Sequence, residues 1–361
     1  MQVNQFKKEA MESISSDPMT RVPDPMKLFV VDSDRFSLDK LFIDVHSHCF
    51  TYDNVPSGFP GMGIRLPDFA LNAIGSTAKW IGAIFSLLTF RERVFWSSYS
   101  KQRFLKRFSK EKEAHDIYMH QLNRYKKAFR EMYKAEPWII MVQLMMDMER
   151  GIKGKVKQGF YEQIVAMDNF RHELENIKGV LPFLAVDPAN PNLLEDFLAV
   201  FSSLNDKRTG AHTENLQSLF PFFGVKLYPS LGYFPSDPVL MPIYEICEEK
   251  NIPITSHCGG ATTHYNKTKY LERKRLIIDA AGKSKEENYR INMRPLLKKK
   301  AKIAKTFNAP DNWIPVLHKF PKLKLNIAHF GSDNEWEAYR NGKANTHIHQ
   351  TLDLLDKLAL L

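Results

Sequence analysis

Three short apolar runs of this chain each end in histidine. Residues 41–48 read LFIDVHSH, residues 251–257 read NIPITSH, and residues 323–329 read LKLNIAH. Short apolar runs of β-favouring residues are typical of buried strands. Packing alone gives no reason for three strands to carry histidine at the same end. The pattern therefore indicates a site at the carboxyl ends of parallel strands, where barrel enzymes place their chemistry.

Further apolar runs alternate with stretches of helical periodicity. Besides the histidine runs, the sequence predicts strands at 138–147, 179–187 and 222–229. It predicts helices at 156–177, 193–204, 241–250 and 312–320, with a last one around 348–359. Alternation of strands and helices favours a parallel sheet covered by helices. We therefore predict an α/β chain with a TIM-barrel-like (β/α)8 fold.

The predicted barrel is incomplete at its C-terminal end. Six strand ends can be counted, at His46, Asp147, Asp187, Tyr228, His257 and His329. After the sixth strand the sequence predicts a loop and one helix, without another β-branched run. Two more βα units would need roughly 60 residues. We expect the chain to stop after the sixth unit, with an open sheet edge at which chains could associate.

His46 and His48 are the first candidate metal ligands. Side chains two residues apart on a strand point to the same side, so both imidazoles can approach one point. Neutral imidazole binds zinc and neighbouring transition metals. Two solvated histidines in a loop are the alternative interpretation. The histidines on the other strands favour a metal site, in which His46, His48 and His257 would bind one divalent ion.

The chain resembles the amidohydrolase superfamily, in its amidohydrolase-related branch of metal-dependent hydrolases. The motifs that carry the resemblance are IDVHSH at 43–48, GVKLYP at 224–229, ITSHCGG at 254–260 and IAHFGS at 327–332. Their order and spacing are similar to strands 1, 4, 5 and 6 of a (β/α)8 barrel. The resemblance covers roughly residues 40–60 and 137–350.

The resemblance implies the same ligands, His46, His48 and His257, for one divalent metal. Zinc is the first choice, and manganese and iron are the alternatives. It also implies an aspartate ligand on strand 8, a place that no residue of the six predicted strands occupies. Asp32, in a short strand at 27–32, and Asp333, after strand 6, are the alternative carboxylates.

Other polar residues at the strand ends complete the candidate site. His329 would be the acid/base or oxyanion group that reaches the substrate, and Asp44 would orient a ligand histidine. A strand-end hydrogen-bonding role is the alternative for Asp44. Lys226 and Tyr228 would contact the substrate. For Lys226 the alternatives are a carboxylated lysine between two metals, as in some amidohydrolases, and a lysine that extends to solvent.

Several segments lie outside the predicted strands. Residues 1–40 form a polar lead-in to the barrel at 41–361. Residues 68–134 are predicted to be a helical insertion that covers the barrel mouth and carries a basic stripe, which is usually a solvated helix face. The most apolar part of the insertion, 80–90, is too short to span a membrane. The basic segment 267–305 is predicted to be helix and loop.

Charge and cysteine content limit the partners and the compartment. The 361 residues include 51 Lys and Arg and 41 Asp and Glu, which gives a formal net charge of +10. This excess favours a small-molecule substrate that is anionic, and we expect no nucleic acid. Three cysteines and no secretory signal predict a cytoplasmic protein without a transmembrane segment. The open sheet edge would allow a homo-oligomer.

Three functions are compatible with these features. The first is metal-dependent hydrolysis of an amide, ester or lactone-like bond by a metal-activated water. The second uses the same site for non-oxidative decarboxylation of an aromatic or unsaturated acid. The third is a non-catalytic protein that binds a partner through the basic helical insertion.

Overall fold

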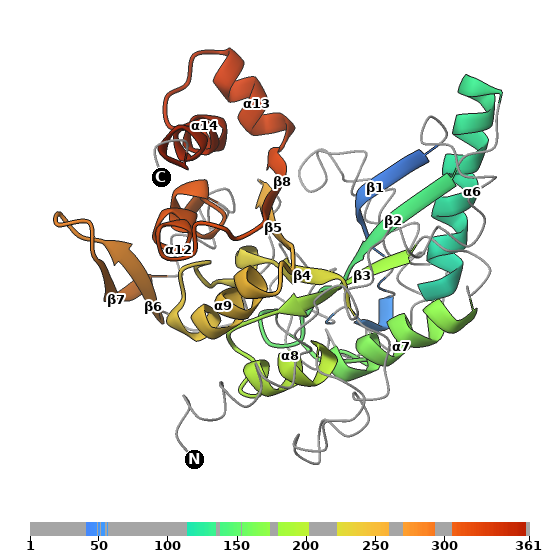
Figure 1. Cartoon of the computed structure of the whole chain (residues 1–361), viewed down its shortest axis with the longest axis horizontal. Coiled ribbons are helices and arrows are strands. Elements are labelled where there is room, and N and C mark those ends of the chain that lie inside the picture. Colours follow the sequence, from blue (N-terminus) through green and yellow to red (C-terminus); the bar gives the residue numbers. More distant parts are fainter. Residues whose placement is uncertain are drawn as a thin grey trace, which may run out of the picture. The chain divides into compact units, whose positions relative to one another are not determined.

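The computed structural model describes residues 41–48, 50, 52–54, 56, 114–134, 138–152, 154–173, 180–201, 222–259, 270–292 and 305–358. The chain divides into two compact units, within residues 37–180 and within residues 181–361. Figure 1 shows their elements. The predictions for the lead-in at 1–40, the strand at 27–32 and the first part of the insertion lie outside the described residues.

The unit within residues 37–180 is built on two parallel strands. β1 (Leu41–Ser47) pairs with β2 (Trp138–Leu144). The other elements are η4 (Tyr52–Asn54), α6 (Ala114–Tyr133) and α7 (Phe160–Glu173). α6 contacts both β2 and α7. Tyr118 and Leu122 are buried one helical turn apart on α6, so this helix packs through one apolar face.

β1 forms where it was predicted but is not buried on both faces. Ile43 and Val45 remain 48% and 55% exposed, because little of the described structure packs against that face. The strand is also irregular: Asp44 pairs with Met141 and Ser47 with Gln143, so β1 carries one residue more than β2 there. Such a bulge bends the strand and redirects its side chains.

The unit within residues 181–361 contains the other predicted strands. β3 (Val180–Val186), β4 (Gly224–Leu227), β5 (Ile254–Gly259) and β8 (Leu325–Gly331) pair in parallel in this order. All residues of β3, β4 and β5 are buried, as parallel strands covered on both faces should be. Parallel strands in sequential order, with helices between them, confirm the TIM-barrel-like α/β class.

Helices follow the strands of this unit, and all of them except α13 were predicted from the sequence. They are α8 (Leu193–Phe201), α9 (Met241–Glu249), α12 (Ile314–Lys319), α13 (Asp333–Arg340) and α14 (His347–Leu358). Short 3-10 helices are η7 (Pro229–Leu231), η8 (Pro238–Leu240) and η9 (Pro310–Trp313). α13 and α14 contact β8. Among the described residues, no helix has the length and apolarity needed to cross a membrane.

Two predictions for the C-terminal half were wrong. Within the basic segment, β6 (Tyr270–Ile278) and β7 (Ser284–Asn292) form an antiparallel hairpin instead of helix and loop (Figure 1). Its turn is closed by Asp279, whose carboxylate accepts from the amides of Ala281 and Lys283. Most of β7 is exposed, so the alternating apolar pattern that reveals a strand is missing.

α13 replaces part of the loop that was predicted after the sixth strand. It has no buried residue, so it lacks the apolar periodicity on which a helix is recognised from sequence. Asp333 and Glu335 lie in its first turn, where carboxylates interact favourably with the helix dipole.

Gly224 provides a direct test of the packing around β4. A Cβ atom there would lie 2.5 Å from the Phe183 ring and 2.7 Å from the Pro253 carbonyl oxygen, which accepts from the Val225 amide. We expect Gly224→Ala to lower the free energy of unfolding by about 3 kcal/mol in urea titrations, because the strands must separate. Gly259→Ala is the control, since a Cβ there meets its nearest atoms at the ordinary contact distances of 3.5–3.7 Å and the residue is not in the left-handed region. An equal loss in both variants would contradict the packing.

Candidate functional site

The two histidines of the first strand converge. His46 Nε2 and His48 Nε2 lie 3.2 Å apart, with the rings nearly perpendicular at 79°. His48 Nδ1 is 2.8 Å from the carbonyl oxygen of Leu144. A carbonyl can only accept, so Nδ1 carries the proton and Nε2 presents its lone pair.

This geometry fits a metal. Two imidazole nitrogens bound to one tetrahedral zinc ion at about 2.0–2.1 Å would lie about 3.3 Å apart, close to the 3.2 Å observed. Histidine ligands usually donate their other ring N–H to a carbonyl or carboxylate, as His48 does to Leu144. Without a metal, the same distance fits a hydrogen bond between the two rings.

Asp44 supports this strand through its backbone. One carboxylate oxygen accepts from the backbone N–H of His46 at 2.9 Å, and the other accepts from the Tyr125 hydroxyl at 2.5 Å. The contact of Asp44 with His46 is therefore made at the main chain.

Two residues of α6 that sequence reasoning missed contact the histidine strand. Tyr125 reaches Asp44, and the Gln121 amide donates to the carbonyl oxygen of His48 at 2.9 Å. The only available signal was their spacing of one helical turn, which places both on one face of a helix.

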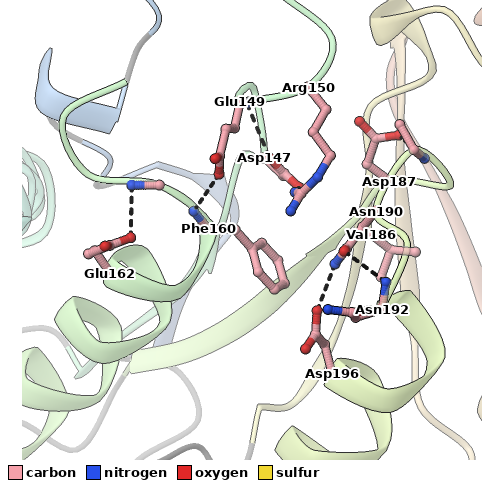
Figure 2. Close-up of polar contacts among 12 residues, drawn as sticks. Asp147, Glu149, Arg150, Phe160, Glu162, Val186, Asp187, Asn190, Asn192 and Asp196 are labelled. Atoms are coloured by element: carbon pink, nitrogen blue, oxygen red, sulfur yellow. Dashed lines mark hydrogen bonds and ion pairs between the residues drawn. The ribbon is translucent and has the colours of Figure 1, made fainter. Parts of the chain in front are cut away.

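An ion pair between a buried aspartate and a partly exposed arginine follows the neighbouring strand (Figure 2). Asp147 accepts from Arg150 Nη1 at 2.9 Å and from the backbone N–H of Glu149 at 3.2 Å. Burial raises the pKa of Asp147, and the Arg150 guanidinium opposes this shift. Asp187, in the other unit, accepts from the Ala189 amide at 2.8 Å. Both aspartates therefore hold the loops after their strands.

Three aromatic rings lie next to one another at the strand ends of the unit within residues 181–361, with His257 in contact with the other two. The Tyr228 ring lies 4.6 Å from the His257 ring, and the His257 ring lies 4.8 Å from the His329 ring. Burial raises the pKa of Tyr228 to about 12, against a smaller opposite effect of its hydrogen bond with Ser230. The Tyr228 phenol is therefore protonated at neutral pH.

Lys226 is buried on β4, two residues before Tyr228. Its side chain is 1% exposed, and within the described residues its Nζ has no hydrogen-bond partner. Desolvation lowers the pKa of Lys226 to about 7. The alternative of a lysine that extends to solvent is therefore wrong.

His329 lies in an irregular part of β8. His257 pairs with Ala328 and Gly259 with Gly331, so β8 carries one residue more than β5 across this stretch. The φ angles of His329 and Phe330 are 67° and 42°, which non-glycine residues adopt mainly at strained or functional positions. Partial burial and then the Lys226 cation lower the pKa of His329.

Asn308 is a further residue of this region that the sequence did not indicate. Its side-chain amide donates to the Gly259 carbonyl oxygen at 2.9 Å and to Ser230 Oγ at 2.7 Å. It thereby ties the end of β5 to the loop after β4. Cys258 contacts His347 at 3.8 Å rather than the site, and burial raises its pKa to about 12.

The structure thus gathers the predicted site residues into two groups. His46, His48 and Asp44 lie in the unit within residues 37–180, whereas Lys226, Tyr228, His257 and His329 lie in the other. Within the described part of the chain, no three His, Cys, Asp or Glu side chains form a ready metal-binding cluster.

Part of the chain is similar to a known family. Residues 219–342 match the family model described as Amidohydrolase. This match includes β4, β5 and β8 and therefore Lys226, Tyr228, His257 and His329. No curated protein matches the chain.

Proposed function

Because residues 219–342 match the family model described as Amidohydrolase, we propose that the chain belongs to the amidohydrolase superfamily and is a metal-dependent hydrolase of an amide, ester or lactone-like bond. Members of this superfamily typically use divalent metals. The observation that carries the proposal is the 3.2 Å approach of His46 Nε2 and His48 Nε2, with His48 Nδ1 bound to a carbonyl oxygen. We propose zinc as the metal, with manganese or iron as alternatives, and His257 as the third ligand.

A bound divalent ion would supply a water of lowered pKa and polarise the substrate carbonyl. Side chains of the protein would transfer the proton and stabilise the substrate oxygen. His329, neutral near pH 7 because its pKa is lowered, could accept a proton from the attacking water and return it to the leaving group. The protonated Tyr228 phenol could donate a hydrogen bond to a substrate oxygen.

Lys226 would bind the substrate through its buried amine. A buried amine with a pKa of about 7 gains a proton most readily when an anion approaches it, because the anion offsets the desolvation of the charge. Its position therefore favours a small anionic substrate, in keeping with the net charge of +10.

Decarboxylation is the second candidate, and Lys226 is the observation that favours it. An amine with a pKa of about 7 can hold and release a proton near neutral pH, and decarboxylation needs a protonation step where hydrolysis needs water attack. The binding-protein alternative depended on the helical insertion, most of which lies outside the described residues.

Metal removal tests the proposal. The purified chain is treated with a chelator, dialysed, and assayed with amides, esters, lactones and aromatic acids before and after addition of zinc, manganese or iron(II). We expect no turnover without metal and recovery at about one ion per chain. Release of a new carboxylate, measured by titration at constant pH, identifies hydrolysis, whereas release of carbon dioxide identifies decarboxylation. Turnover that does not depend on metal would contradict both.

A further inference from the structure

α6 holds the histidine strand at two points, one for each histidine. Tyr125 contacts Asp44, which binds the His46 amide, and Gln121 contacts the His48 carbonyl. We propose that Tyr125 and Gln121 are positioning residues, which fix the spacing of the histidine pair and thereby set the affinity for a divalent metal. This inference rests on the proposed function.

The first contact is a three-residue chain. The Tyr125 hydroxyl donates to one oxygen of Asp44 at 2.5 Å, and the His46 N–H donates to the other oxygen at 2.9 Å. The Tyr125 ring also lies 5.0 Å from the Phe42 ring. Tyr125 therefore fixes the orientation of the Asp44 carboxylate, and Asp44 fixes the main chain at His46.

In the second contact, the Gln121 side chain makes hydrogen bonds both to His48, directly after β1, and to β2. Gln121 is buried, and its amide donates to the His48 carbonyl oxygen at 2.9 Å. Its own side-chain oxygen accepts from Gln143 of β2 at 3.4 Å. Gln143 is fully buried, so the orientation of the Gln121 amide is determined by the neighbouring strand.

The strand needs this support because its own pairing is weak at the histidines. The bulge between Asp44 and Ser47 interrupts the ladder with β2. On the exposed face, Ile43 and Val45 receive little packing. Contacts from α6 to Asp44 and to the His48 carbonyl oxygen add hydrogen bonds where the ladder is interrupted.

One rigid element makes both contacts. Tyr125 and Gln121 are one helical turn apart, and the buried residues Tyr118 and Leu122 anchor the helix. A displacement of α6 would therefore move His46 and His48 together. The last helix of the predicted insertion thus supports the metal ligands, whereas the sequence had suggested only a cover over the barrel mouth.

Matched variants of α6 test this inference. Tyr125→Phe removes only the hydroxyl that binds Asp44, and Tyr133→Phe removes the same group from an exposed position on the same helix, where the ring contacts Phe129. Gln121→Met removes the second contact at similar volume. Cobalt(II) titration of the metal-free full chain, followed by its visible absorption, gives affinity and ligand geometry.

We expect Tyr125→Phe and Gln121→Met each to weaken cobalt binding about tenfold, the lower end of the effect of residues behind metal ligands. The absorption bands should also change shape, and Tyr133→Phe should match the wild type. Urea unfolding midpoints of the metal-free variants show whether each variant folds. If Tyr125→Phe or Gln121→Met does not fold, the cobalt affinity of the other variant tests the inference. Wild-type affinity and spectrum in the folded contact variants would overturn the inference.

Amide hydrogen exchange of the metal-free protein tests whether α6 holds the histidine strand, independently of metal binding. Exchange across residues 41–48 should be several-fold faster in Tyr125→Phe than in Tyr133→Phe, because the His46 amide loses its fixed acceptor. Equal exchange would overturn the support by α6, whatever the metal result. A wild-type chain that binds no cobalt would contradict the proposed function and the effect of α6 on metal affinity. The exchange experiment would then still show whether α6 holds the histidine strand.

Discussion

The double variant His46→Ala/His48→Ala is expected to lose the bound metal. Metal content should fall from about one ion per chain to less than about a tenth, because an isolated third ligand cannot hold a divalent ion against buffer. Turnover on any substrate found for the wild type should fall on the order of a thousandfold, since a metal supplies several kcal/mol of transition-state stabilisation.

Elemental analysis after gel filtration measures this loss. His318→Ala is the matched control, because His318 is an exposed histidine on α12 and belongs to neither site group. It should keep the full metal content. Full metal content in the double variant would show that the histidine pair is not a metal site.

His257→Ala, analysed in the same way, tests the third ligand. We expect partial metal loss, with weaker binding than in the wild type, because two of three protein ligands remain. A His257→Ala variant with wild-type affinity would assign the third ligand to another residue and leave the pair of the first strand unaffected.

The second large effect concerns the pH dependence of stability. Lys226 has a pKa of about 7 in the folded chain, against the ordinary value of 10.5. The unfolded chain therefore holds a proton on this amine between about pH 7 and 10.5 that the folded chain lacks. Stability should rise with pH across this range. Below about pH 7 the destabilisation is complete, and its upper limit is roughly 5 kcal/mol.

Lys226→Met removes this cost at similar side-chain length. We expect the metal-free variant to be more stable than the wild type by about 3 kcal/mol or more at pH 6, with the advantage shrinking toward pH 10. Urea unfolding at several pH values measures the difference. His329 must be considered in the analysis, because the Lys226 cation lowers its pKa and the substitution will let it rise.

Lys324→Met is the control for this experiment. Lys324 is exposed, so its replacement should change stability by less than about 0.5 kcal/mol and equally at every pH. A stability difference between Lys226→Met and the wild type that stays constant from pH 6 to pH 10 would show that the amine is solvated in the folded chain.

Much of the architecture could be predicted because it is encoded in short-range patterns. The strands that end near His46, Tyr228 and His257 were found from apolar runs a few residues long. The approach of His46 to His48 follows from the two-residue period of a strand, although the bulge that redirects them is not visible in the sequence. The hairpin β6–β7 and helix α13 were missed because both are largely exposed and carry no apolar period.

The sequence by itself determined the order of the parallel strands and of most helices between them, the histidine pair and the position of the lysine at a strand end. Only the tertiary structure decided the state of Lys226, whose burial depends on strands and loops far apart in the chain. It also decided that Tyr125 binds Asp44 across 81 residues and Gln121 binds His48 across 73. Local periodicity reports which face of an element is apolar, whereas desolvation and side-chain contacts depend on which distant residues pack against that face.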